Sequence, residues 1–151
     1  EVFIEPADAT VNAEAVAATV TAAERDGAAS HGLFRIPGYV AALKSGKVNG
    51  LAKPKAEDLA PATLRMDGDG GFAPLAHRLS RPLLAERARA QGLAALGIVN
   101  VHHFSALWVE VEALAFEGGV VFPREGFLHE SFGANLEAPH AFHGFFDGCG
   151  V

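Results

Sequence analysis

The sequence is poor in cysteine, in long apolar runs and in leader-like features. Its 151 residues include one cysteine, Cys149, which excludes an internal disulfide and a cysteine-based zinc site and suits a reducing compartment. No apolar run approaches the ~20 residues that span a bilayer. The N-terminus has no basic leader followed by an apolar run, so we expect no signal peptide and no membrane segment. The expected location is cytoplasmic.

Basic residues and nucleotide-binding glycines are also scarce. Twelve Lys and Arg stand against 18 Asp and Glu, and the formal net charge of -6 argues mildly against a nucleic-acid partner. The glycine-rich segment 67–71 lacks the spaced glycines of a dinucleotide fingerprint and predicts a tight turn instead. What the sequence does have, 50% hydrophobic and 20% charged residues, is typical of a globular domain that can bury a core.

Hydrophobic periodicity predicts an α/β fold. The predicted order is helix, helix, strand, helix, strand, helix, strand. The helices are expected at residues 12–25, 38–44, 73–91 and 106–117, and the strands at 63–66, 93–101 and 119–122.

Four further expectations concern particular segments of this fold. The nearly continuous apolar run at 93–101 predicts a strand buried on both faces. Pro82 should break or kink the helix that contains it, because proline removes an amide donor and clashes with the preceding turn. Residues 47–61 are expected to form a surface connection, and residues 123–151 to be irregular.

The first candidate site is the segment around Ser30, His31 and Arg35. An imidazole donates or accepts a proton near neutral pH, and a guanidinium clamps a carboxylate with two parallel hydrogen bonds. The three residues together would suit a 2-oxo or 2-imino acid, with Arg35 on the carboxylate and His31 managing the proton. By spacing alone, the plainer interpretation is favoured: a capping serine in a loop beside an exposed histidine and arginine.

The second candidate site, residues 102–105, follows the predicted strand 93–101. In α/β sheets, ligands bind beyond the carboxyl ends of the strands, so a cofactor phosphate or nicotinamide would fit here, although a polar strand end is the plainer interpretation. His102 and His103 lack a nearby third ligand. A metal-binding module using these histidines or His129, His140 and His143 is therefore a minor hypothesis, and we predict no metal site.

The same segments resemble the non-Rossmann malate/L-lactate dehydrogenase family. The resemblance begins in Arg25–Val40 and continues, in the order and spacing of the family, through 46–50, 67–72 and 88–93. The stretch His102–Trp108, followed by Val111 and Glu112, is similar to the branch of the family that reduces Δ1-piperideine-2-carboxylate and Δ1-pyrroline-2-carboxylate.

This resemblance implies a nicotinamide-dependent reductase of a cyclic imino acid or a related 2-oxo acid. It implies NADPH, or alternatively NADH, as cofactor, a homodimeric assembly, and a fold distinct from the classical dinucleotide-binding domain. Ser30 and His31 would belong to the proton relay, and Arg35 would bind the substrate carboxylate. The residues expected to contact the cofactor are His103, Phe104, Ser105, Ala106 and Leu107.

By the same resemblance, the chain divides into three segments and is truncated relative to the family. Residues 1–60 would form an N-terminal helical substrate-binding segment, 61–122 a partial α/β cofactor-binding segment, and 123–151 an irregular tail. Ala134 stands where the family has a substrate-contacting threonine, and the acidic member of the relay has no counterpart. These departures leave a second hypothesis open: a truncated, non-catalytic relative acting as a binding or dimerisation module.

Overall fold

The computed structural model describes residues 9–102, 106–116, 119–124 and 128–133, with Leu107 and the last two ranges described by their backbone. Helices and strands alternate as an α/β fold requires. In chain order, the elements are α1 Ala9–Arg25, η1 Leu33–Arg35, α2 Ile36–Lys44, β1 Lys55–Ala60, β2 Thr63–Asp67, α3 Ala73–Gln91, β3 Leu93–Val99, α4 Leu107–Phe116, β4 Gly119–Arg124 and β5 Leu128–Gly133.

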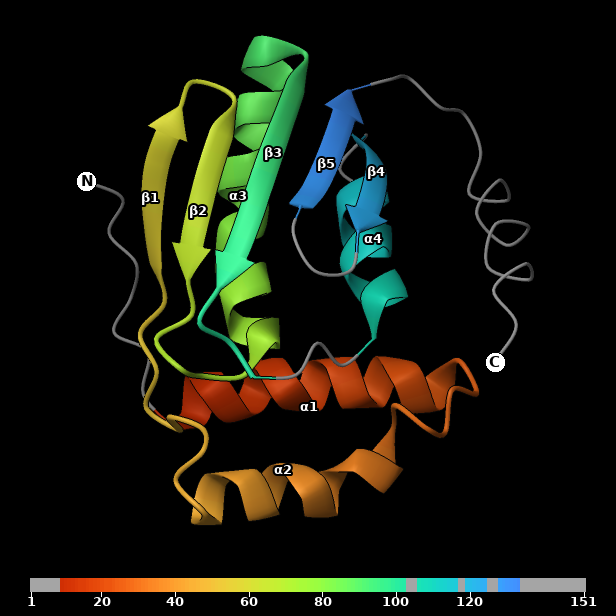
Figure 1. Cartoon of the computed structure of the whole chain (residues 1–151). Helices are drawn as coiled ribbons and strands as arrows, with labels where there is room; N and C mark the ends of the chain where they lie inside the picture. Colours follow the sequence, from red (N-terminus) through yellow and green to blue (C-terminus); the bar gives the residue numbers. More distant parts are fainter. Residues whose placement is uncertain (1–8, 103–105, 117–118, 125–127, 134–151) are drawn as a thin grey trace.

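The described strands form one mixed sheet in the order β1-β2-β3-β5-β4. β2 and β3 are parallel, with Leu64 beside Leu96, and α3 makes the crossover between them. The other pairs are antiparallel. Figure 1 shows α3 and α4 behind the sheet, and α1 and α2 lying across one end of it. The segment between α1 and α2 therefore lies at the same end of the sheet as the start of α4.

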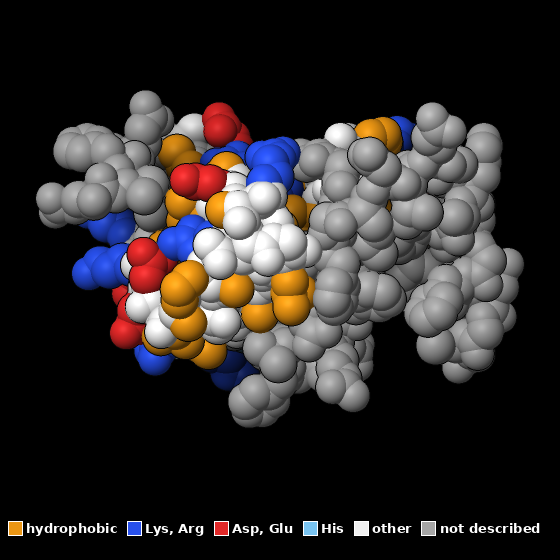
Figure 2. All heavy atoms as spheres, turned by 90° about the horizontal axis from the view of Figure 1, so that it is seen from above, with side chains coloured by type: hydrophobic (Ala, Val, Ile, Leu, Met, Phe, Trp, Pro, Cys, Tyr) orange, Lys and Arg blue, Asp and Glu red, His pale blue; other side chains and the backbone are white. Residues whose placement is uncertain are grey.

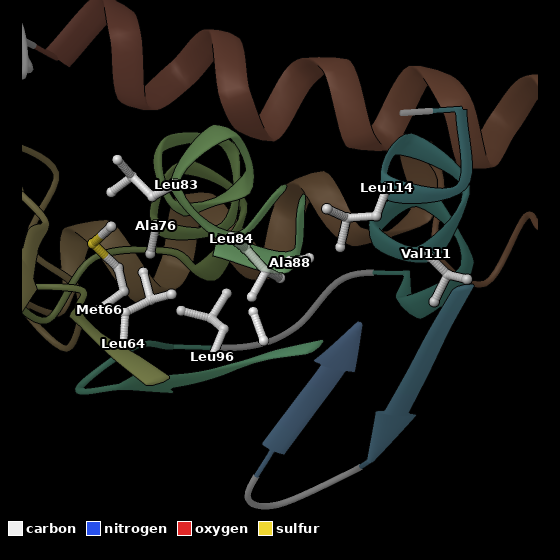
Figure 3. Packing of buried hydrophobic residues seen from close by; sticks show 10 residues of the cluster. Leu64, Met66, Ala76, Leu83, Leu84, Ala88, Leu96, Val111 and Leu114 are labelled. Carbon is white, nitrogen blue, oxygen red and sulfur yellow. The ribbon is translucent and has the colours of Figure 1, made fainter. Parts of the chain in front are cut away.

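The main core lies between α3 and the sheet. Leu64 and Leu96 point from the strands toward Leu84 of α3, and Leu114 of α4 closes the side of the cluster (Figure 3). Leu64, Leu84 and Leu96 are 0% exposed. Burying a leucine side chain contributes about 1.5–3 kcal/mol, so these contacts hold α3 to the sheet.

β3 is covered on one face only among the described residues. Ala94 and Leu96 face α3 and are buried, whereas Leu93 and Val99 are each 39% exposed. The prediction of a strand buried on both faces is therefore wrong for this part of the chain. The reason is that both described helices behind the sheet pack on the same face.

A second cluster attaches α1 and α2 to the sheet. Val20 of α1, Tyr39 of α2, Val48 and Phe72 are buried together. The rings of Tyr39 and Phe72 meet edge to face with centroids 5.1 Å apart. This cluster holds the two N-terminal helices in place and thereby places the segment between them.

The turn predicted at 67–71 is confirmed. Asp69 and Gly70 have φ values of +53° and +69°, and Gly71 donates to the carbonyl of Gly68 over 2.9 Å. Asp67 Oδ1 accepts hydrogen bonds from Asp69 N over 2.9 Å and from Asn100 Nδ2 over 3.0 Å. The hydrogen bond from the Asp69 amide, with that from Asn100, lowers the pKa of the Asp67 carboxyl.

Three local expectations are corrected. Of the break or kink expected at Pro82, the break does not occur. α3 continues through Pro82 because Leu83, Leu84 and Ala88 pack into the core on its far side. Within the expected surface connection 47–61, residues 55–60 form the edge strand β1, whose six residues are all exposed and so show no apolar alternation. Within the expected irregular tail, residues 128–133 form β5.

The surface at the end of the sheet opposite α1 and α2 carries acidic and basic side chains mixed together (Figure 2). Within the ranges that the structure describes, no helix is both long and apolar enough to cross a membrane.

Candidate functional site

The segment that carries Ser30 and His31 begins where α1 ends. α1 stops at Arg25, and Gly27 adopts a left-handed backbone with φ +76°. Ala28 then donates to the carbonyl of Ala23 over 2.9 Å, which satisfies one of the last carbonyls of the helix. A further turn follows, because His31 N donates to the carbonyl of Ala28 over 2.8 Å. The two candidate residues thus sit on a tight, hydrogen-bonded turn directly after α1, which ends at Arg25 as the helix expected at 12–25 does.

Ser30 is in direct contact with both His31 and Arg35. Ser30 Oγ lies 3.0 Å from His31 Nδ1, at hydrogen-bonding distance. Arg35 Nε donates to the main-chain carbonyl of Ser30 over 2.6 Å. His31 and Arg35 are half-buried and Ser30 is exposed. The structure therefore brings together all three residues that the sequence selected, although their roles stay predictions.

Glu24 of α1 anchors η1 beside this turn. Its Oε2 accepts a hydrogen bond from Leu33 N over 2.9 Å. Gly32 makes that approach possible, because a Cβ on residue 32 would overlap the Glu24 carboxylate and lie 3.3 Å from its Cα. The position of Arg35, at the end of η1, depends on this contact.

Trp108, on the first turn of α4, packs against the same turn from the other side. Its ring lies edge-on to the ring of His31, with centroids 5.7 Å apart and an interplanar angle of 80°. Its Nε1 donates to Asp26 Oδ2 over 3.2 Å, across 82 residues of sequence. Arg25 pairs with Asp26 Oδ1 at 2.8 Å. The hydrogen bond from Arg25, with that from Trp108, lowers the pKa of the Asp26 carboxyl.

Sequence reasoning did not select Trp108 or Asp26 as site residues. Trp108 was part of the family resemblance, but no local pattern connects it to residue 26 or 31. The contact exists because α4 returns to the end of α1, which only the packing of the two helices produces.

The predicted cofactor-contacting segment is described in part. His103, Phe104 and Ser105 lie outside the described residues. Ala106 is 2% exposed, and Leu107 is the first residue of α4. Just before the segment, His102 donates from its amide to the carbonyl of Gly71 over 2.8 Å, and its ring contacts that of Phe72. The segment thus begins at a fixed point, and these assignments too stay predictions.

Glu110 is a buried acid that sequence reasoning missed. It lies in the first turn of α4 and is 6% exposed. Burial raises its pKa to about 8, so the carboxyl is mostly uncharged at neutral pH. The available signal was a glutamate inside the apolar run Leu107–Phe116, where the helix has few other polar residues.

No group of three or more histidine, cysteine, aspartate or glutamate side chains comes together as a metal site among the described residues. His140, His143 and Ala134 lie outside the described residues, and of His129 the backbone alone is described.

Comparisons with known proteins add to this geometry. The family model described as malate/L-lactate dehydrogenase matches residues 3–123. The Delta(1)-pyrroline-2-carboxylate/Delta(1)-piperideine-2-carboxylate reductase of Pseudomonas aeruginosa is 54% identical over 108 residues, which are 72% of this chain and 32% of that protein. The chain thus spans about a third of the length of the curated relatives it matches.

Two solved structures share the fold. The structure of delta1-piperideine-2-carboxylate reductase from Pseudomonas syringae superimposes with a TM-score of 0.73 and 44% identity, over 76% of this chain and 35% of that one. Sulfolactate dehydrogenase from Methanocaldococcus jannaschii superimposes with a TM-score of 0.67 and 28% identity, over 72% of this chain and 31% of that one.

Proposed function

Because this chain belongs to the malate/L-lactate dehydrogenase family, we propose that it is the substrate-facing part of a nicotinamide-dependent reductase. The proposed substrate is a cyclic imino acid of the Δ1-pyrroline-2-carboxylate or Δ1-piperideine-2-carboxylate type, or a related 2-oxo acid. The names of its relatives support this substrate class. We also propose that the protein is cytoplasmic, which its single cysteine suits.

The observation that carries the proposal is the contact of Ser30 Oγ with His31 Nδ1 at 3.0 Å. Whichever group donates in this hydrogen bond, it occupies Nδ1 and leaves Nε2 to face a substrate. Reduction of a C=N bond adds a hydride to carbon and a proton to nitrogen. In its protonated form, His31 would deliver that proton from Nε2 and return to the neutral imidazole, keeping its other proton at Nδ1. Ser30 would hold the ring in the orientation that this requires.

Arg35 supplies the complementary charge. Its Nε donates to the carbonyl of Ser30, the residue next to His31, and this bond restrains the guanidinium. Its two terminal nitrogens form the fork that binds a carboxylate through parallel hydrogen bonds. Among the residues that the structure describes, no ion pair occupies Arg35. A 2-carboxylate held there would present the adjacent C=N nitrogen to the imidazole.

The residues at the start of α4 fit a nicotinamide dinucleotide. The first amides of a helix and the positive end of its dipole favour anionic phosphates. Glu110 lies in that first turn, yet burial raises its pKa to about 8, so it adds little negative charge at neutral pH. Residues 103–107 would hold the cofactor, with NADPH expected and NADH as the alternative. When bound, the reduced nicotinamide supplies the hydride.

A second copy of the chain is the proposed protein partner. Leu33 and Phe34 beside the site are 63% and 77% exposed. Ile36, Val40 and Leu43 follow on α2 at helical spacing and are 38–42% exposed, so they share one helix face. Apolar side chains gathered in this way favour a covered surface, which supports the homodimer that the family resemblance implies.

The proposal is tested by cofactor binding and turnover of the chain. We expect calorimetry to detect heat on titration with NADPH. We also expect NADPH absorbance to fall when Δ1-piperideine-2-carboxylate is added. The absence of binding heat in a sample that circular dichroism shows to be folded would overturn the proposal for this chain. For Arg35→Ala, the matched control is Arg65→Ala, because it removes an exposed arginine that pairs with Glu57 on the sheet, outside the site.

A further inference from the structure

Trp108 contacts the turn of the candidate site at two points. Its ring meets that of His31 edge to face at 5.7 Å, and its indole N–H is donated to Asp26 at 3.2 Å. It is the one tryptophan of the sequence. Because α4 begins just before it, this side chain connects the start of α4 to the turn after α1.

The imidazole of His31 needs such a contact. The turn that carries it lies at the surface, and Ser30 beside it is exposed. A single hydrogen bond at Nδ1 fixes one ring atom but leaves the ring free to swing about it, because the last torsion of a histidine side chain has broad minima. An aromatic neighbour prefers an edge-to-face arrangement and so restrains the plane of the ring.

The indole is itself held in place. Asp26 accepts its N–H, and Arg25 pairs with the other carboxylate oxygen of Asp26 at 2.8 Å. Both charged groups belong to the end of α1 and the turn that follows it, and Arg35 is tied to the carbonyl of Ser30 in the same turn. Trp108 is therefore held by the hydrogen bond of its Nε1 to Asp26 while its ring contacts the imidazole of His31.

We propose that Trp108 is a positioning residue that holds the imidazole of His31 against Ser30, so that Nε2 is presented to the substrate. This inference rests on the proposed function for the role of His31, but not for the contact itself. Its consequence is that the segment expected to hold the cofactor and the residue expected to deliver the proton are joined through one side chain.

The first test measures the state of the His31 ring by NMR, without any turnover. Long-range correlations between ring protons and nitrogens show which nitrogen of a neutral imidazole carries the proton, and His31→Asn identifies the His31 signals by their loss. In the wild-type chain we expect one tautomer. Trp108→Leu should give a mixture of tautomers, and Trp108→Phe, which keeps an aromatic edge, should retain one. Phe116→Leu, at the exposed far end of α4, is the matched control and should change nothing.

A folded Trp108→Leu chain with the wild-type tautomer would overturn the positioning role. If Trp108→Leu does not fold, Trp108→Phe with labelled histidine and the ring-current shift of the His31 signals decide the question. Loss of the single tautomer in the phenylalanine variant would contradict a role for the aromatic edge.

The second test separates positioning from folding by kinetics. Trp108→Leu should lower kcat about three- to tenfold and leave KM for the imino acid near wild type, because Arg35 keeps its bond to Ser30. A rise in KM with kcat unchanged would overturn the inference. If no chain, the wild type included, reduces the imino acid, the proposed function fails, while the NMR comparison still decides whether Trp108 orients His31.

Discussion

The guanidinium of Arg35 donates from Nε to the main-chain carbonyl of Ser30 over 2.6 Å. This bond closes the turn that carries His31 and sets the candidate anion-binding group beside the candidate proton donor. It also means that Arg35 has a role in the turn besides the role proposed for it toward substrate, and substitutions of Arg35 should separate the two.

Arg35→Ala should weaken the use of the imino acid. Loss of a charged, hydrogen-bonded partner of this kind costs on the order of 2–4 kcal/mol, and we expect that loss in kcat/KM, with KM raised and turnover lowered. Steady-state kinetics measure both. Arg35→Lys should recover part of the loss, because it restores the charge but not the fork. Wild-type kinetics for Arg35→Ala would show that Arg35 does not bind the substrate.

His31→Ala should abolish the chemical step and leave cofactor affinity nearly intact. The physical reason is that the imidazole is the proposed proton donor and is not among the residues expected to hold the cofactor. Calorimetry with NADPH measures the cofactor affinity, and single-turnover kinetics measure the rate of the chemical step. A collapse of cofactor affinity would assign His31 a structural role instead.

Gly32→Ala should disturb the site from the backbone. The added Cβ would meet the Glu24 carboxylate and displace it from Leu33 N, with a cost of about 1 kcal/mol or more in unfolding free energy. Gly38→Ala in α2 is the control, because its Cβ has nothing within 4 Å. That change should stabilise the chain by roughly 0.5–1 kcal/mol through helix propensity. Urea unfolding measures the unfolding free energy of both variants. Equal changes in the two would contradict the predicted clash of the new Cβ with Glu24.

Glu110 should make stability depend on pH. Burial raises its pKa to about 8 in the folded chain, above the ordinary value of 4.5, so the folded state binds one more proton between these values. Its contribution is full below pH 4.5 and is lost as pH rises through 8, at up to about 1.4 kcal/mol per pH unit.

Glu110→Gln should remove this slope, and the exposed Glu112→Gln should keep it. Thermal unfolding between pH 5 and 8 measures the difference. The lowered pKa values of Asp26 and Asp67 act in the opposite direction, but below the ordinary carboxyl range, so they do not enter this window. A wild-type curve as flat as that of Glu110→Gln would show that the carboxyl is not buried in solution.

Phe34→Asp should weaken the proposed self-association. A carboxylate at a side chain that is 77% exposed costs the single chain little, but within a dimer interface it would be buried without a partner. We expect analytical ultracentrifugation to show dimer for the wild type and monomer for the variant at the same concentration. Leu59→Asp, on the edge strand β1 and 56% exposed, should remain dimeric. Dissociation by both changes alike would place the interface elsewhere.

Much of the fold follows from local signals. The helix ends at Gly27 and Gly92, the turn at 67–71 and the strand after Thr63 all match expectations, because glycine geometry and apolar spacing act over a few residues. β1 and β5 were missed. β1 is an exposed edge strand, which is specified by its partner β2 and not by its own pattern. β5 is specified by its pairing with β3 and β4 on either side of it. The helix is not broken at Pro82, because the packing of α3 against the sheet outweighs the local cost of proline.

The same distinction between local signals and tertiary packing applies to the candidate site. The sequence by itself determined that Ser30, His31 and Arg35 are neighbours, because they lie within six consecutive residues and the chain keeps them close. It also determined the family, through motifs in a set order. Only the tertiary structure decided that Trp108 meets His31 and Asp26, and that Glu110 lies buried with a raised pKa. Those facts depend on which faces of α1 and α4 come together. That packing is a property of the whole core, and no single segment of the chain encodes it.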